Sequence, residues 1–181
     1  MALVLAATSR ESLAAAEALF EERLTQLAAG DRQKLGEELY AITRLLVAER
    51  GLRRAFSDPA TSPEQRAGLA GSVLTGKVGA PTLDTVNELV GQRWSGPGDL
   101  VEATESLART ALLAAAEKQR ALDDVEDQLF RFGRILEREP ELTTLLADAD
   151  TPAEKRIGLL DGVLGTKVYP VTAALLRDLV R

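Results

Sequence analysis

Residues 51–82 read GLRRAFSDPATSPEQRAGLAGSVLTGKVGAPT, and residues 141–172 read ELTTLLADADTPAEKRIGLLDGVLGTKVYPVT. The two stretches align without a gap at a shift of 90 residues. Over the wider ranges 35–90 and 125–180, 18 of the 56 aligned positions are identical. An ungapped match at a fixed period is typical of duplicated structural units. The sequence therefore predicts one structural unit followed by a second copy of it.

The composition favours helices in both copies. The chain contains 31 Leu and 28 Ala among 181 residues, whereas aromatic residues make up 4%. Leu and Ala are strong helix formers, and the β-branched residues that favour strands are scarce. We therefore expect an all-α fold, in which an N-terminal six-helix bundle and a partial duplicate bundle are joined by a long helix.

Glycine and proline residues divide the chain into these parts. Residues 99–132 contain neither, so they form either one long helix or two helices with a kink between Lys118 and Asp123. We expect an N-terminal bundle over residues 1–98, a connecting helix shared by both bundles over 99–120, and an incomplete second bundle over 121–181. The equivalent of Trp94 would be residue 184, so we also expect that the last helix lacks its successor and that the sequence is a piece of a longer one.

Two Thr-x-x-Glu motifs indicate helix starts. Thr8 with Glu11, and Thr61 with Glu64, fit a capping box, in which each side chain bonds a free backbone N–H at the other position. Residues 71–78 differ by one residue from a phosphate-binding loop. Their glycines lie within and at the end of an expected helix, however, and the second copy does not keep them. We therefore interpret this motif as a helix C-terminus with a Gly cap.

Missing residue types exclude several classes of function. The chain has no His and no Cys, which removes imidazole and thiolate chemistry, both catalytic and metal-binding. Its net charge of −6 argues against nucleic-acid binding. No apolar run is long enough to span a membrane and no signal peptide precedes the first helix, so the chain looks cytosolic. We predict no catalytic, cofactor-binding or metal-binding residue, and we interpret the acidic clusters as solvated helix faces.

Several short segments resemble one known family. Residues Leu52–Pro59, Lys77-Val78 and Gln92–Ser95, the last followed by Asp99-Leu100, resemble the delta subunit of F-type ATP synthases, the bacterial relative of the oligomycin-sensitivity-conferring protein. The duplicated bundle and the acidic run that leads into residues 129–134 resemble the long actinobacterial form of this subunit. The chain departs from the common family pattern at Gln92-Arg93-Trp94.

The resemblance implies a structural role. In the family, this subunit is a non-catalytic stator on the cytoplasmic face of the bacterial plasma membrane. Its N-terminal bundle binds the amphipathic N-terminal helix of an alpha subunit, in a groove between the first and fifth helices. A C-terminal domain, for which these 181 residues have no counterpart, binds the membrane-anchored b-type stalk subunit. A helical-repeat adaptor with an unrelated partner is the alternative that the residues leave open.

The family groove can be carried over to this sequence by position. The first helix would contribute apolar residues and an acidic residue that orients the incoming helix, and the fifth helix would contribute apolar residues and a terminal arginine. The same spacing also fits a buried seam between helices, so spacing does not separate groove from core. The candidate alpha-subunit-binding residues are Leu13, Ala16, Glu17, Phe20, Leu83, Val86, Val90 and Arg93.

Overall fold

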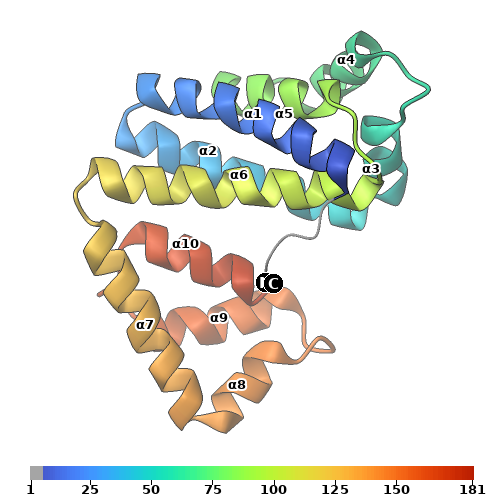
Figure 1. Cartoon of the computed structure of the whole chain (residues 1–181). Coiled ribbons are helices and arrows are strands. Elements are labelled where there is room, and N and C mark those ends of the chain that lie inside the picture. The colour runs from blue at the N-terminus through green and yellow to red at the C-terminus, as the bar shows by residue number, and fades with distance from the viewer. Residues whose placement is uncertain (1–5) are drawn as a thin grey trace. The chain divides into compact units, whose positions relative to one another are not determined.

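The computed structural model describes residues 6–181, which form ten α-helices and no strand (Figure 1). The all-α prediction is confirmed. The helices are α1 (Ala7–Gln26), α2 (Ala29–Ala48), α3 (Arg50–Ser57), α4 (Pro63–Leu74), α5 (Ala80–Gly91), α6 (Pro97–Lys118), α7 (Leu122–Arg138), α8 (Pro140–Ala147), α9 (Ala153–Leu164) and α10 (Pro170–Leu179).

The described chain divides into two compact units. The first ends at Ala111 and the second runs from Leu112 to Arg181, so the division lies within α6. The expected boundaries at residues 98 and 120 stay predictions. After α6 the chain turns at Arg120, whose φ of 57° is in the left-handed region. Of the two arrangements expected for residues 99–132, the chain thus forms two helices rather than one.

The core of the first unit follows the apolar spacing of the sequence. On α1, the side chains that recur at three- and four-residue steps are buried, which is the pattern of a helix that packs one face inward. On α2 and α5 the same spacing holds. These buried residues are Leu13, Ala16, Phe20 and Leu24 on α1, Leu35, Leu39, Ile42 and Leu46 on α2, and Val86, Leu89 and Val90 on α5.

The second unit has a smaller core, which repeats positions of the first. Its buried cluster takes one residue from each of α7, α8 and α9, and two from the region of α10: Phe132, Leu146, Leu160, Leu176 and Val180. The residues 90 positions earlier are also buried: Ile42, Phe56, Ala70, Val86 and Val90. The block α7–α10 is thus built on the plan of the block α2–α5.

A polar contact is repeated as well. In the first unit the carboxylate of Glu38 on α2 accepts hydrogen bonds from the backbone N–H of Gly79, at 2.9 Å, and from the hydroxyl of Thr82. In the second unit, the side-chain oxygen of Gln128 accepts a hydrogen bond from the hydroxyl of Thr172, at 2.8 Å, and another from the backbone N–H of Tyr169. Each bond reaches a helix N-terminus that has no side-chain cap of its own. A neighbouring helix therefore supplies the missing acceptor.

Both expected capping boxes are wrong in detail. The α4 cap is Ser62, which accepts from the N–H of Gln65 and receives the reciprocal bond from its side chain. The hydroxyl of Thr61 instead donates to Asp58. At the first helix, the cap position is Ala6, two residues before Thr8, and it makes no side-chain cap bond. Thr8 therefore lies inside the first turn of α1.

The segment that resembles a phosphate-binding loop is a helix end. After α4 stops at Leu74, the chain turns at Gly76 with φ of 77°, and the N–H of Lys77 donates to the carbonyl of Leu74 at 2.9 Å. A phosphate loop needs a strand before it, and the described residues form none. The interpretation as a Gly-containing helix C-terminus agrees with this geometry.

Candidate functional site: the α1–α5 seam

Helices α1 and α5 pack against each other in the first unit, and one arginine links them. The guanidinium of Arg23 on α1 makes two bonds to the carboxylate of Glu88 on α5, at 2.5 and 2.8 Å, and a third to the hydroxyl of Thr85 at 3.1 Å. Both charged side chains are partly buried. A two-point bond of this kind fixes orientation as well as distance, so it sets the spacing of the two helices on this side.

Serine residues link the beginning of α1 to the chain that follows α5. The hydroxyl of Ser12 donates to the backbone carbonyl of Arg93 at 2.6 Å. The hydroxyl of Ser9 donates to Asp99 at 2.5 Å and accepts from the N–H of Ser95 at 2.8 Å. Both serines are buried, so these bonds satisfy polar groups that water cannot reach. They hold the beginning of α1 against the segment that follows α5 and against the first turn of α6.

The pair Arg93-Trp94 separates into a surface residue and a core residue. Trp94 is 6% exposed, and its indole N–H donates to the carbonyl of Leu89 at 2.8 Å. Arg93 is exposed. Trp94 therefore belongs to the edge of the core, whereas the Arg93 side chain is free to meet a partner.

The candidate alpha-binding residues divide by burial in the same way. All lie on α1 or α5, apart from Arg93, which follows α5. Glu17 and Leu83 are half-buried, and Arg93 is exposed. The others are packed inside the bundle: Leu13, Ala16, Phe20, Val86 and Val90. A partner helix on the surface would meet the first three directly, and the five buried residues would fix the helices that carry them.

Two α1 residues matter here that sequence reasoning did not select. Leu19 is 45% exposed, because it lies off the inward-facing spacing of its helix. Arg23 carries the link to α5. Its partner Glu88 is 65 residues away, and the sequence around Arg23 does not indicate that the two side chains meet. Such pairings need the folded arrangement of both helices.

The carboxyl group of Glu17 in the seam has a shifted pKa. Partial burial raises the pKa of Glu17 above its ordinary value, and the carboxylate of Glu21, one helical turn away, raises it further. Desolvation and like-charge repulsion both disfavour the charged form. A cationic residue of a partner helix would favour the charged form and so offset both effects.

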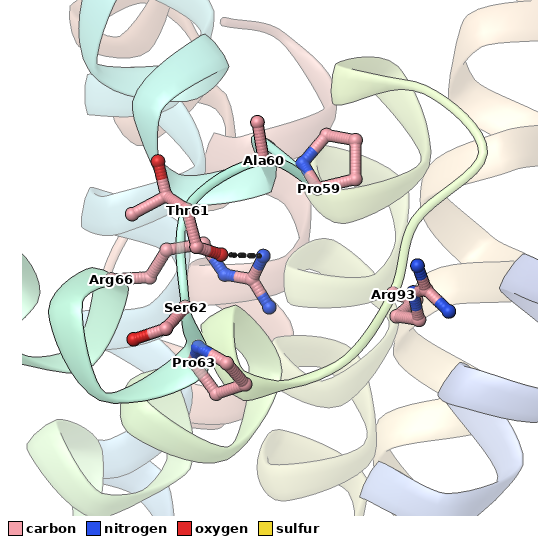
Figure 2. Close-up of a pocket in the computed structure, with 7 residues that line it drawn as sticks. All are labelled: Pro59, Ala60, Thr61, Ser62, Pro63, Arg66 and Arg93. Atoms are coloured by element: carbon pink, nitrogen blue, oxygen red, sulfur yellow. Dashed lines mark hydrogen bonds between the residues drawn. The ribbon is translucent and has the colours of Figure 1, made fainter.

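A shallow hollow beside this region is walled by the segment Pro59–Pro63 and two arginines, Arg66 and Arg93 (Figure 2). Its volume is about 310 Å³. Arg66 is 2% exposed and already directs its donors to backbone carbonyls, so it has none left for an anion. The acceptors are the carbonyls of Val90 at 2.6 Å, Asp58 at 2.7 Å, Thr61 at 3.0 Å, and Gly91 and Gln92 at 3.1 Å.

Residues 6–181 lack two further features that would indicate other kinds of site. These residues contain no group of three or more acidic, His or Cys side chains placed to hold a metal ion. None of the described helices is long and apolar enough to cross a membrane.

The fold and the seam define an all-helical protein built on a repeated four-helix block, whose candidate site is a helix–helix surface rather than a catalytic pocket. Comparison with known proteins identifies its relatives. Residues 108–181 match the family described as ATP synthase delta (OSCP) subunit. An ATP synthase subunit delta from Streptomyces griseus is 47% identical over 172 residues, which cover 95% of this chain and 63% of that protein.

Two other relatives give the same result. An ATP synthase subunit delta from Acidothermus cellulolyticus is 43% identical over 175 residues, covering 96% of this chain and 64% of that protein. An ATP synthase subunit b-delta from a Mycobacterium species (strain KMS) is 44% identical over 173 residues, covering 96% of this chain and 39% of that protein. The predicted resemblance is confirmed: the chain is a homologue of the actinobacterial ATP synthase delta (OSCP) subunits, and it spans less than two thirds of the length of these relatives.

Proposed function

We propose that this chain is part of a non-catalytic stator, the peripheral stalk of a proton-translocating F-type ATP synthase. The observation that carries the proposal is the 47% identity, over 95% of the chain, to a protein named ATP synthase subunit delta. A stator must resist torque, which calls for a stiff body and tight helix contacts rather than titrating groups. Buried apolar seams and two-point polar links supply such stiffness in the first unit.

Its partner on the catalytic head is the N-terminal helix of an alpha subunit, which docks along α1 and α5. The exposed side chain of Arg93 and the half-buried Glu17 and Leu83 meet the incoming helix. The link between Arg23 and Glu88 holds the two helices at a constant spacing. Helix-in-groove recognition of this kind reads apolar anchors at helical spacing and uses charges to set orientation.

The second partner is a b-type stalk subunit, which binds through the portion of the relatives that this chain does not span. The name of the mycobacterial relative, b-delta, joins the two subunits in one description. The assembly would place the chain at the cytoplasmic face of the plasma membrane, as a peripheral component. The first unit then serves as the head-binding domain, and residues 99–120 connect it to the second.

Calorimetric titration of the full chain with a synthetic peptide tests this function. The peptide is the N-terminal segment of the Streptomyces griseus alpha subunit, and a scrambled peptide of equal composition is the reference. Leu83→Glu should weaken binding about tenfold, because it places a charge against an apolar anchor. Leu145→Glu on α8, at a residue that is 53% exposed, is the matched control and should leave binding unchanged.

Equal binding of the scrambled peptide would favour the adaptor with an unrelated partner. Absence of binding at millimolar peptide would reject docking along α1 and α5. Loss of binding in the Leu145→Glu control would move the site to the second unit.

A further inference from the structure

The corner between α2 and α3 carries three arginines and an accessible apolar side chain. Val47, near the end of α2, is 56% exposed. Arg50 and Arg54 are exposed and lie one helical turn apart on α3, and Arg53 beside them is half-buried. These four residues are called the α2–α3 basic face below. The face concentrates positive charge on a chain whose net charge is −6.

The second unit forms the same corner without these side chains. Both α3 and α8 have 8 residues, and the glutamates before them, Glu49 and Glu139, have similar ψ angles of 82° and 76°. After each helix an aspartate, Asp58 or Asp148, accepts hydrogen bonds from the N–H two residues later and from the threonine hydroxyl three residues later. At the positions of the face, the second unit has Glu137, Pro140, Thr143 and Thr144. The backbone of the corner therefore does not require the basic face.

One arginine of the face has a structural contact, and a threonine makes the same contact in the second unit. Nη1 of Arg53 donates to the backbone carbonyl of Leu46 at 3.4 Å. The hydroxyl of Thr143 donates to the equivalent carbonyl, that of Leu136, at 2.8 Å. Because a neutral hydroxyl satisfies this carbonyl at a shorter distance, the fold does not need the charge of Arg53.

The charged residues around the face leave an excess of positive charge. Residues 44–58 contain four arginines and two acidic residues, Glu49 and Asp58. The carboxylate of Asp58 already accepts two hydrogen bonds from its own turn. Helix α4, which packs against α3, contributes one charge of each sign, Glu64 and Arg66. Within residues 6–181, no carboxylate forms an ion pair with the three arginines of the face.

The positive charges of the face are unfavourable for the first unit on its own. Like charges one turn apart on a helix repel each other, as Arg50 and Arg54 do. Arg50 is also the first residue of α3, where a cation opposes the helix dipole, whereas the first turn of α8 contains Glu141. An arrangement that is unfavourable for folding, and that the second unit shows to be dispensable, indicates a role in binding. Anionic groups of a partner would offset both effects.

We propose that the α2–α3 basic face binds an acidic segment of another polypeptide, whose carboxylates pair with the arginines and whose apolar side chain covers Val47. Arginine binds a carboxylate through two parallel hydrogen bonds, and Arg53 keeps donors free for this beyond the one that it gives to Leu46. The exposed valine favours a peptide over a free phosphate, which gains nothing from an apolar contact. The proposal is independent of alpha-subunit docking, because that docking uses α1 and α5.

Nuclear magnetic resonance of the labelled full chain tests the proposal. The probe is a synthetic peptide that repeats the triplet Glu-Glu-Leu and is blocked at both ends. Saturable shifts should cluster on residues 47–54, and binding should weaken as the salt concentration rises. A peptide with glutamine in place of every glutamate should bind about tenfold more weakly, because it cannot form the charged pairs.

Substitutions taken from the second unit separate binding from folding. The double variant Arg53→Thr, Arg54→Thr introduces the residues that α8 has at these positions, so its thermal midpoint should not fall. It should nevertheless bind the acidic peptide about tenfold more weakly. The matched control is the double variant Arg134→Thr, Arg138→Thr, which removes the same net charge from exposed positions of α7 and should leave binding unchanged.

Three outcomes would overturn the proposal. The first is unchanged binding in the α3 double variant, or an equal loss in the α7 control. The second is the absence of shifts on residues 47–54 at millimolar peptide. The third is tighter binding of inorganic phosphate, or of phosphatidylglycerol vesicles, at the same residues, which would assign the face to phosphate groups instead of an acidic polypeptide.

Discussion

At the scale of single residues, two arginines 90 positions apart show how one side chain can close a helix end. Arg66 donates to carbonyls at the end of α5 and in the turn before α4, whereas its counterpart Arg156 donates to the carbonyl of Arg181, at 2.8 Å. The Nε of Arg156 is buried without a partner. The first arginine is thus fully satisfied and the second is not.

Replacing these arginines should therefore have unequal effects. Arg66→Met should lower the free energy of unfolding by about 2–4 kcal/mol, because it leaves several buried carbonyls without donors. Arg156→Met should cost about 1 kcal/mol or less, since it removes one bond and one unsatisfied donor. Urea unfolding followed by circular dichroism measures both. An equal loss in the two variants would contradict the assigned roles.

Glu17 makes stability depend on pH in a defined direction. Because the fold raises the pKa of this carboxyl above its ordinary value of 4.5, the folded state binds more protons than the unfolded state over the interval between the two values. Its contribution is most favourable below that interval and is lost as the pH rises through it. Glu17→Gln should raise the thermal midpoint slightly at pH 7 and leave it unchanged near pH 3. Calorimetry at both pH values measures this, and a lower midpoint at pH 7 would contradict the sign.

At the scale of elements, the repeated polar contact offers an internal control. Gln128 occupies in the second unit the place that Glu38 occupies in the first, and both accept two hydrogen bonds. Glu38→Gln should therefore change the free energy of unfolding by less than about 0.5 kcal/mol, whereas Glu38→Ala should cost about 1–2 kcal/mol. Urea titration of the two variants separates them. A large cost for the glutamine variant would mean that the charge itself is required.

The positions of the helices could be predicted from the sequence, whereas their caps could not. Apolar spacing and the Gly and Pro positions located the helices, because burial of one face dominates helix formation in proteins. Which residue caps a helix depends on the exact residue at which the helix begins, and a shift of one residue changes the cap. Ser62 rather than Thr61 caps α4, since Thr61 bonds to Asp58. The link from Arg23 to Glu88 was not predictable either, because its partners are distant in sequence.

The candidate site was predictable only in outline. Spacing along α1 and α5 gives the inward faces, and five of the eight candidate residues are indeed packed inside the bundle. Which residues remain accessible depends on how neighbouring helices cover each face. Sequence periodicity alone does not contain this information. Glu17, Leu83 and Arg93 stand out only in the folded unit.

At the scale of the whole molecule, the two units differ in how much apolar surface they bury. The second has a core cluster of five buried residues and exposes Phe130, Leu145 and Leu179. Regions with fewer buried contacts open more readily. Amide hydrogen exchange should therefore be faster in α8–α10 than in the corresponding α3–α5. Exchange measured by mass spectrometry on the full chain tests this, and slower exchange in α8–α10 would contradict the difference in packing.

The proposed function depends on docking of the N-terminal helix of an alpha subunit along α1 and α5 of the first unit. The most direct test is a nuclear magnetic resonance titration of the full labelled chain with the N-terminal peptide of the Streptomyces griseus alpha subunit. Docking at this seam should give saturable shifts that cluster on residues 9–24 and 81–94. Shifts confined to residues 121–181, or no shifts at millimolar peptide, would contradict it.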